Sequence, residues 1–238
     1  MHLPIILIPT FQPEQILIEL VKEIIKQDPL QNIVVVNDGS DKSYDEIFSA
    51  IEQFKQVTLL SHHSNQGKGA ALKTGIKYIL NTYNKHSCPG VITVDADGQH
   101  HVDDVMKILH AMQKDPSKLY LGTREFIKDN APWRSRFGNK LTKLITQKIY
   151  RLPITDTQSG LRGMPFDFIK HCLTLKGQAY DFEMEVLLSL KHSKLNVEEI
   201  PIRTIYLNNN ESSHFNPLLD SVKIYCAFMR FIKPRKSS

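Results

Sequence analysis

Residues 91–100 read Val91-Ile-Thr-Val-Asp95-Ala96-Asp97-Gly98-Gln99-His100. Four residues suited to a buried strand run directly into two carboxylates. A short apolar run that ends in polar groups predicts a central strand of a parallel sheet, and open α/β sheets bind ligands at the carboxyl ends of such strands. Two hard oxygen donors there suit Mg²⁺ or Mn²⁺, ions that usually share their sites with substrate phosphates.

An earlier segment, Asn32-Ile-Val-Val-Val36-Asn37-Asp38-Gly39-Ser40, has the same design. Gly39 tolerates a positive φ, so the chain can turn sharply and leave Asp38 at the crevice. Either segment alone is also explained as an ordinary turn with a solvated acidic side chain. Two acidic strand ends separated by a strand and helices favour a ligand site.

Composition indicates a soluble globular protein, with 238 residues, 41% of them hydrophobic and 23% charged. The net charge of +5 fits an anionic partner such as a nucleotide, a lipid phosphate or a membrane surface. Basic residues are not interleaved with aromatic ones, so no nucleic-acid partner is expected. Three cysteines far apart in sequence (Cys88, Cys172 and Cys226) favour a reducing, cytoplasmic location.

No signal peptide is expected, because the apolar N-terminus is only a strand long and lacks a basic start and a cleavage site. No apolar stretch approaches the roughly 18 residues of a membrane span. Any membrane contact is therefore expected to be peripheral, at the inner face of the membrane.

Apolar spacing predicts alternating strands (3–8, 33–36, 57–60, 91–94, 118–122) and helices (14–26, 44–54, 68–83, 103–112). This alternation predicts an α/β fold, a mostly parallel sheet with helices on both faces. A less regular half should follow, with a loop at 125–136, a helix at 137–150, strands near 157–164 and 197–206, and a helix at 218–232. We expect one domain over 1–238, divided into a first half (1–124), a less regular half (125–214) and a terminal helix with a basic tail (215–238).

Three loops of the first half carry candidate binding groups. Phe11, after the first strand, either stacks on a nucleobase or belongs to the core. Residues 65–71 (NQGKGAA) offer glycines and a helix N-terminus to a phosphate, yet match neither standard phosphate-loop motif. Lys68 in this loop either binds that phosphate or is solvated, and Arg124 at the end of the fifth strand can clamp a phosphate with two hydrogen bonds.

Six segments in this order resemble the family 2 glycosyltransferases: IPTF, VNDGS, NQGKGAAL, DADGQH, GTR and DTQSGLRG. They are most similar to the dolichyl-phosphate mannose synthase and polyprenyl-phosphate glycosyltransferase branch. The resemblance covers residues 3–210. It implies a Rossmann-like GT-A fold, a GDP- or UDP-hexose donor, a divalent metal (Mg²⁺ or Mn²⁺) and inversion at the sugar C1. It also implies that residues 1–124 form a nucleotide-sugar half and residues 125–214 an acceptor half.

Carried onto this chain, the resemblance places Pro9, Phe11 and Asp38 around the nucleoside. Asp95, Ala96 and Asp97 form the Asp-x-Asp motif, Gln99 can join the metal, and Arg124 lies near the donor or lipid phosphates. Pro13 stands where the family pattern has glutamate, and Asn37 where it has an acid. The departure at Pro13 bears on the nucleoside contacts. The late phosphate loop of the family is also absent, since residues 210–215 read NESSHF, and this absence leaves the acceptor open.

The predicted chemistry follows the charge that develops on the leaving diphosphate. A metal on Asp95 and Asp97 would neutralise it, and Arg124, Arg203 or His214 would add positive charge. A lipid-phosphate acceptor is already an anion, whereas a glycan hydroxyl needs a carboxylate base, for which Asp156 is the first candidate.

Three other activities were weighed. A nucleotidylyltransferase would show a glycine-rich basic loop after the first strand, and a phosphatase with an Asp-x-Asp nucleophile would carry that pair after its first strand. The intact Asp95 and Asp97 argue against an inactive nucleotide-sugar-binding protein, although Pro13 and Asn37 favour it.

Two segments of the second half have predicted roles at the acceptor. Loop 125–136 carries Arg134 and Arg136 beside Trp133 and is expected to close over the acceptor phosphate. The helix at 218–232 is amphipathic and basic. Its apolar stripe either packs on the domain or lies on an anionic membrane beside a polyprenyl acceptor.

Overall fold

The computed structural model describes residues 2–124, 154–157 and 159–203. Its strands are β1 (Ile5–Thr10), β2 (Ile33–Asn37), β3 (Val57–Ser61), β4 (Gly90–Thr93), β5 (Leu119–Arg124), β6 (Arg162–Pro165) and β7 (Val197–Ile202). Its helices are α1 (Ile16–Gln27), α2 (Asp45–Glu52), α3 (Lys68–Thr82), α4 (Val102–Lys114), α6 (Phe166–Cys172) and α7 (Tyr180–Ser189). Short 3₁₀ turns, η1 (Lys42–Tyr44) and η2 (Leu190–His192), precede α2 and follow α7.

The strands form one seven-stranded sheet in the order β3-β2-β1-β4-β6-β5-β7. The first four strands pair in parallel (β1 with β2 and β4, and β2 with β3), and β5 runs parallel to β7. Strand β6 is antiparallel to both β4 and β5 and separates them. The predicted mostly parallel sheet is confirmed, but the strand expected near 157–164 begins only at Arg162.

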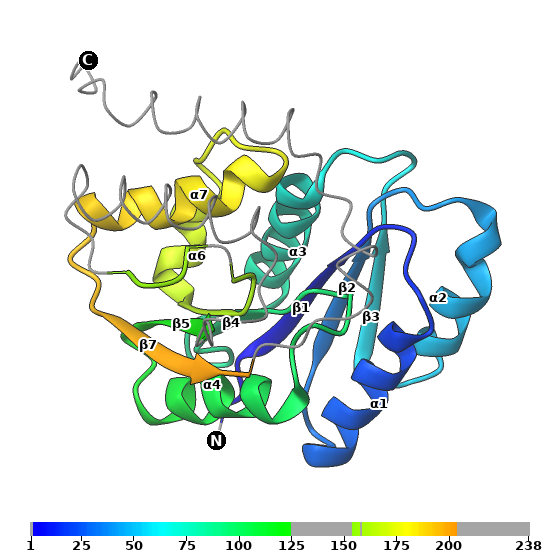
Figure 1. Ribbon diagram of the computed structural model, residues 1–238, viewed down its shortest axis with the longest axis horizontal. Coiled ribbons are helices and arrows are strands. Elements are labelled where there is room, and N and C mark those ends of the chain that lie inside the picture. Colours follow the sequence, from blue (N-terminus) through cyan, green and yellow to red (C-terminus); the bar gives the residue numbers. More distant parts are fainter. Residues whose placement is uncertain (1, 125–153, 158, 204–238) are drawn as a thin grey trace, which may run out of the picture.

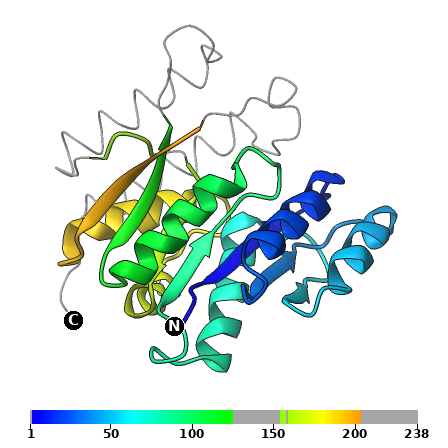
Figure 2. The same cartoon turned by 90° about the horizontal axis from the view of Figure 1, so that it is seen from below.

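Helices cover both faces of the sheet (Figures 1 and 2). Helices α3, α6 and α7 pack on one face, and α1, α2 and α4 pack on the other. Strand β1 serves both layers, because Ile5 and Leu7 join the first cluster while Ile6 and Ile8 join the second. A strand buried on both faces reads as a continuous apolar run, which is why the sequence predicts this central strand well.

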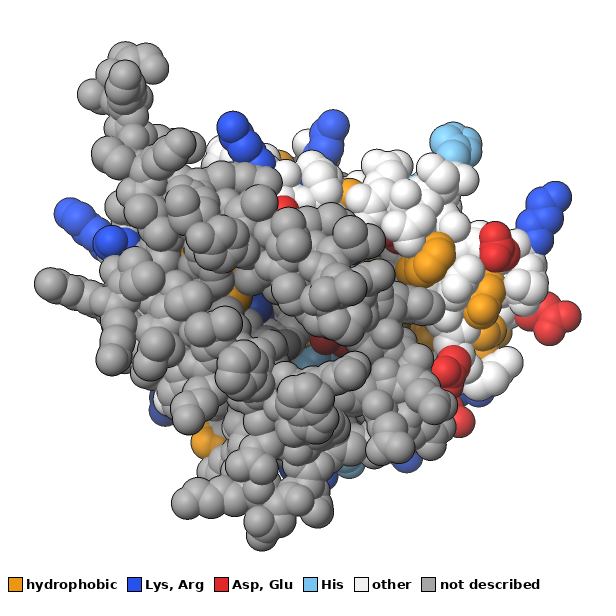
Figure 3. Space-filling view, turned by 45° about the horizontal axis from the view of Figure 1, so that its top comes forward, with side chains coloured by type: hydrophobic (Ala, Val, Ile, Leu, Met, Phe, Trp, Pro, Cys, Tyr) orange, Lys and Arg blue, Asp and Glu red, His pale blue; other side chains and the backbone are white. Residues whose placement is uncertain are grey.

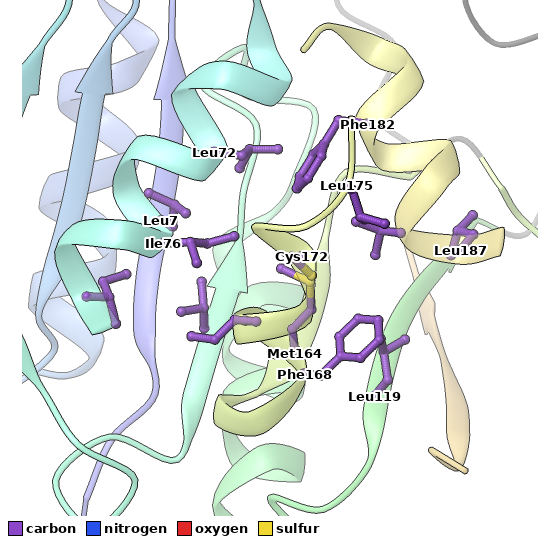
Figure 4. Packing of buried hydrophobic residues seen from close by; sticks show 14 of the residues in the cluster. Leu7, Leu72, Ile76, Leu119, Met164, Phe168, Cys172, Leu175, Phe182 and Leu187 are labelled. Carbon is purple, nitrogen blue, oxygen red and sulfur yellow. The ribbon is translucent and has the colours of Figure 1, made fainter. Parts of the chain in front are cut away.

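The packing of the first layer positions α7 against α3. Phe182 of α7 lies between Leu72 of α3 and Leu175 of the loop before α7 (Figure 4). Consequently the first turns of α3 and α7 lie side by side.

Helices α6 and α7 were not predicted. Helix α6 has only seven residues, too few for a clear 3.6-residue period. Helix α7 is buried over nearly its whole length, so it lacks the polar face that marks an amphipathic helix. Its start does carry a signal, the acidic residues Asp181 and Glu183 in the first turn.

The predicted loop at 125–136, the helix at 137–150 and the terminal helix at 218–232 lie outside the described residues. In the part of the chain that is described, no helix has the length and apolarity needed to cross a membrane. In the view of Figure 3, the visible Lys and Arg side chains lie mainly around the margin.

Candidate active site

The predicted carboxylate pair lies at the carboxyl end of β4, next to the end of β1. Gly98 adopts a φ of +74°, a left-handed conformation that costs glycine little. The Asp97 Oδ1 accepts a hydrogen bond from the Gln99 backbone N–H at 3.0 Å. This tight turn keeps Asp95 and Asp97 on one short loop before α4.

Each carboxylate oxygen of Asp95 has a side-chain partner. Its Oδ1 is 2.7 Å from the Lys68 Nζ, and its Oδ2 is 3.3 Å from the His100 Nε2. Gly160 passes so close that a Cβ there would lie 2.3 Å from the Asp95 Oδ2. The Thr93 hydroxyl donates to the Gly160 carbonyl at 2.7 Å, which fixes this approach.

Lys68, the first residue of α3, links Asp95 to α7. Its ammonium is also 2.9 Å from the Glu183 Oε2. The Nζ lies 5.5 Å from the centre of the Tyr180 ring, within range of a cation–π interaction. The Lys68 side chain is only 18% exposed, so solvent screens these ion pairs weakly.

The two carboxyl groups of the loop are shifted in opposite directions. Burial favours the neutral acid at both positions, but the Lys68 ammonium and the neighbouring His100 hold the pKa of Asp95 below its usual range. Burial and the negative charge of Asp95 raise the pKa of Asp97. Burial opposes the charge of Lys68 too, yet Asp95 and Glu183 raise its pKa above the usual range.

Asp95 and Asp97 fit a hard divalent cation. Asp97 pairs with no cationic side chain among the described residues, so a cation beside it would relieve its repulsion with Asp95. Within the described part of the chain, no three His, Cys, Asp or Glu side chains are grouped as a metal site. Magnesium commonly binds through one or two carboxylates, with waters and substrate phosphates as its other ligands, and this site matches that pattern.

Asp38 lies buried behind the crevice, with 2% exposure. Its Oδ1 accepts the Gln66 backbone N–H at 2.9 Å and is 2.6 Å from the His62 Nδ1. Its Oδ2 accepts the Gly67 N–H at 2.8 Å. Asp38 therefore fixes the backbone just before Lys68. Contact between Asp38 and a nucleoside stays a prediction. A nucleoside bound there would share the Asp38 carboxylate with the partners named above.

The glycines of residues 65–71 serve packing. A Cβ on Gly67 would lie 2.6 Å from the Gln178 carbonyl oxygen, and one on Gly69 would lie 2.5 Å from the Phe182 Cβ. The Ala70 N–H donates to that same Gln178 carbonyl at 2.9 Å. The loop before α7 therefore occupies the Ala70 N–H, and phosphate binding by this helix N-terminus stays a prediction.

The remaining nucleoside candidates line the carboxyl edge of the sheet. Pro9 is buried in β1, and Phe11 and Ala96 are partly buried. After Phe11, Gln12 adopts a φ of +48° and its N–H donates to the Ser40 Oγ at 2.8 Å. This bond ties the β1 loop to the Asp38 loop, while base stacking by Phe11 stays a prediction.

Arg124 and Asp156 form a two-pronged ion pair. The Arg124 Nε donates to the Asp156 Oδ2 at 2.8 Å, and a second guanidinium nitrogen donates to Oδ1 at 3.2 Å. Asp156 is 3% exposed. Both carboxylate oxygens face a guanidinium, so Asp156 holds Arg124 in place at the end of β5.

We expect Asp156→Ala to lower the free energy of unfolding by about 3 kcal/mol, because it removes a buried carboxylate partner of Arg124. Urea denaturation measures this loss. Because the two side chains act as a pair, Arg124→Met should lower the free energy of unfolding less in the Asp156→Ala variant than in the unmodified protein. Strictly additive losses would contradict the coupling.

Arg203 and Gln99 also have described positions. Arg203 follows β7, and its guanidinium lies 2.6 Å from the Asp103 Oδ2 while its backbone N–H donates to the Asp104 Oδ2 at 2.9 Å. These contacts tie β7 to the first turn of α4, and a phosphate-binding role for Arg203 stays a prediction. Gln99 is partly buried beside Asp97, and its metal contact likewise stays a prediction. Arg134, Arg136 and His214 lie outside the described residues.

Two residues of the site were missed by the sequence analysis. Glu183 was missed together with α7, although its place in an acidic helix start was a usable signal. His100 is the last residue of segment 91–100, and the sequence predicted no role at this position. Its side chain is 6% exposed, and its Nδ1 has no hydrogen-bond partner among the described residues.

Comparison with known proteins identifies the family of this chain. Residues 5–173 match the model of the family Glycosyl transferase family 2. An uncharacterized protein of Methanocaldococcus jannaschii is 35% identical over 216 residues, covering 89% of this chain and 85% of the relative. The UDP-N-acetylglucosamine–dolichyl-phosphate N-acetylglucosaminyltransferase of Methanococcus voltae is 30% identical over 220 residues, covering 84% of this chain and 85% of that protein.

A solved structure shows the same fold. Glucosyl-3-phosphoglycerate synthase from Mycobacterium tuberculosis, in complex with Mn²⁺, UDP and glucosyl-3-phosphoglycerate, has a TM-score of 0.67 at 14% identity. The match covers 96% of this chain and 80% of that one. The sheet and its acidic strand end thus define a GT-A glycosyltransferase. The chain belongs to glycosyl transferase family 2, and it is an enzyme of the hexosyltransferase class by homology.

Proposed function

We propose that this enzyme transfers a hexose from GDP- or UDP-hexose to a polyprenyl phosphate, with inversion at C1 and with Mg²⁺ or Mn²⁺ at Asp95 and Asp97. The relative from Methanococcus voltae, which is named for transfer to dolichyl phosphate, supports this acceptor class. A polyprenyl acceptor is embedded in a membrane, so the enzyme would work as a peripheral protein at the inner face of the membrane.

On the donor side, Asp95 and Asp97 would hold the cation between the sheet edge and the diphosphate. The bound cation would neutralise the charge that develops on the leaving diphosphate. The described contacts prepare these groups: the close approach of Gly160 restrains the Asp95 carboxylate, and the turn at Gly98 presents Asp97. Electrostatic groups held in place in this way need no rearrangement during the reaction.

On the acceptor side, the pairing of Asp156 is the observation that carries the proposal. A glycan hydroxyl must lose a proton to a base, and the predicted base, Asp156, has both oxygens on Arg124. Glu183 is likewise paired with Lys68. A phosphate acceptor is already a nucleophilic anion and needs no base. The arrangement therefore favours a lipid phosphate over the alternative, a glycan hydroxyl.

Transfer to lipid can be measured directly. The full chain is incubated in detergent with a polyprenyl phosphate and radiolabelled UDP-glucose, UDP-N-acetylglucosamine or GDP-mannose, and the organic phase is counted. We expect one donor to give an extractable product that requires Mg²⁺ or Mn²⁺ and disappears with EDTA. Transfer only to oligosaccharide acceptors would replace the proposal with the glycan alternative. Donor binding without transfer or donor hydrolysis would indicate an inactive binding protein.

A further inference from the structure

Lys68 bridges two carboxylates, Asp95 and Glu183, one of which is a proposed metal ligand. We propose that Lys68 is an internal counterion: it neutralises Asp95 while the donor site is empty and moves to the donor diphosphate when metal and donor bind, with Glu183 as its constant partner. Metal and nucleotide then bind in a mutually dependent way. This inference rests on the proposed function, because it concerns the same donor site.

The backbones on both sides of the bridge are fixed. Lys68 follows Gly67, whose N–H is held by Asp38 at 2.8 Å. On the other side, the buried Arg162 donates to the Glu183 carbonyl oxygen at 2.7 Å. Any change at the bridge must therefore come from side chains. The flexible four-carbon stem of the lysine lets its ammonium move while α3 stays in place.

A cation on Asp95 competes with the lysine. The Lys68 ammonium lies 2.7 Å from the Asp95 Oδ1 and so occupies a carboxylate that would bind a divalent ion. Two cations on one carboxylate repel each other, and in a partly buried site this repulsion is stronger than in water. Glu183, at 2.9 Å from the ammonium, offers Lys68 a carboxylate outside the Asp-x-Asp loop.

The donor diphosphate supplies a second anionic partner for Lys68, which allows its ammonium to leave Asp95. A nucleoside diphosphate bound to the cation brings anionic oxygens to the same edge of the sheet. Lys68 can then pair with a phosphate and Glu183, while the cation takes Asp95. Linkage makes the effect reciprocal: nucleotide strengthens metal binding by the same factor by which metal strengthens nucleotide binding.

Manganese binding tests the idea without catalysis. Free Mn²⁺ is followed by electron paramagnetic resonance as the full chain is titrated, first with the metal alone and then with saturating UDP or GDP. Lys68→Met should bind Mn²⁺ alone more tightly, on the order of tenfold, because the competing cation is gone. The increase in affinity caused by the nucleotide should be smaller in this variant than in the unmodified protein.

Glu183→Gln should act in the opposite direction. It leaves Asp95 as the only carboxylate of the bridge, so Lys68 holds Asp95 more firmly and Mn²⁺ alone should bind several-fold more weakly. The matched control is Lys77→Met, an exposed lysine on the same helix, which should behave like the unmodified protein. Circular dichroism checks that each variant is folded.

The outcomes separate this inference from the proposed function. Equal Mn²⁺ affinity in Lys68→Met and the unmodified protein overturns the counterion role and leaves the metal site intact. Tighter Mn²⁺ binding with an undiminished nucleotide effect shows that Lys68 stays on Asp95, which overturns the transfer to the diphosphate. Absence of Mn²⁺ binding in every protein, with and without nucleotide, overturns the proposed metal-dependent function itself.

Discussion

Asp97→Asn is expected to lower sugar transfer on the order of 10³-fold while the protein stays folded. Charge stabilisation by a bound cation contributes several kcal/mol to such reactions, and each 1.4 kcal/mol is a factor of about ten. The amide keeps the size of the side chain but removes an anionic ligand. Steady-state transfer assays with Mg²⁺ or Mn²⁺, together with thermal melting, measure both parts of this expectation.

Stability provides an internal check on this variant. Asp97 lies beside the charged Asp95, and no cationic side chain of the described residues pairs with it. Removing its charge removes a repulsion, so the melting temperature without metal should be unchanged or higher. Asp167→Asn is the matched control, since it changes an exposed aspartate paired with Lys85 on the surface, where ion pairs contribute little. Transfer by Asp97→Asn at the unmodified rate would rule out the metal role of this residue.

The central strands could be predicted because strands buried on both faces are apolar at nearly every position. Residues 33–36 and 91–94 are apolar except for Thr93, and the structure buries residues 33–36 of β2 and all of β4. From such strands, the crevice edge of the sheet follows by a general rule of open α/β folds. Hence Asp95 and Asp97 were correctly placed at the carboxyl edge from the sequence.

Other parts of the site depend on contacts between residues distant in sequence. Whether the Asp38 carboxylate faces the crevice or the protein is decided by the N–H groups of Gln66 and Gly67, 28 and 29 residues further along. The insertion of β6 between β4 and β5 depends on pairing, which periodicity does not encode. Glu183 reaches Lys68 only because Phe182 packs α7 against α3.

Gly160→Ala should disable the site through a single methyl group. A Cβ at this position would lie 2.3 Å from the Asp95 Oδ2 and 2.5 Å from its Oδ1, far inside van der Waals contact. The Gly160 backbone is held by Thr93, so the carboxylate has to move instead. Misplacing a reacting or coordinating group by about 1 Å can cost on the order of 10²-fold in rate, and we expect a loss of that size in kcat/KM together with weaker Mn²⁺ binding.

Gly122→Ala is the matched control for this methyl group. Its added Cβ would lie 3.1 Å from the Ile202 Cδ1 and 3.2 Å from the Leu161 carbonyl oxygen, so its neighbours need to shift by only a few tenths of an ångström. This variant should therefore keep most of its activity and its Mn²⁺ affinity. The decisive comparison is Mn²⁺ binding without donor, measured for folded Gly160→Ala, Gly122→Ala and unmodified protein. If Gly160→Ala binds Mn²⁺ and transfers sugar as the unmodified protein does, Asp95 does not need its described position, and the site must be built differently. A selective loss in Gly160→Ala would instead tie metal binding to the position of one carboxylate, because the methyl group carries no charge and forms no hydrogen bond.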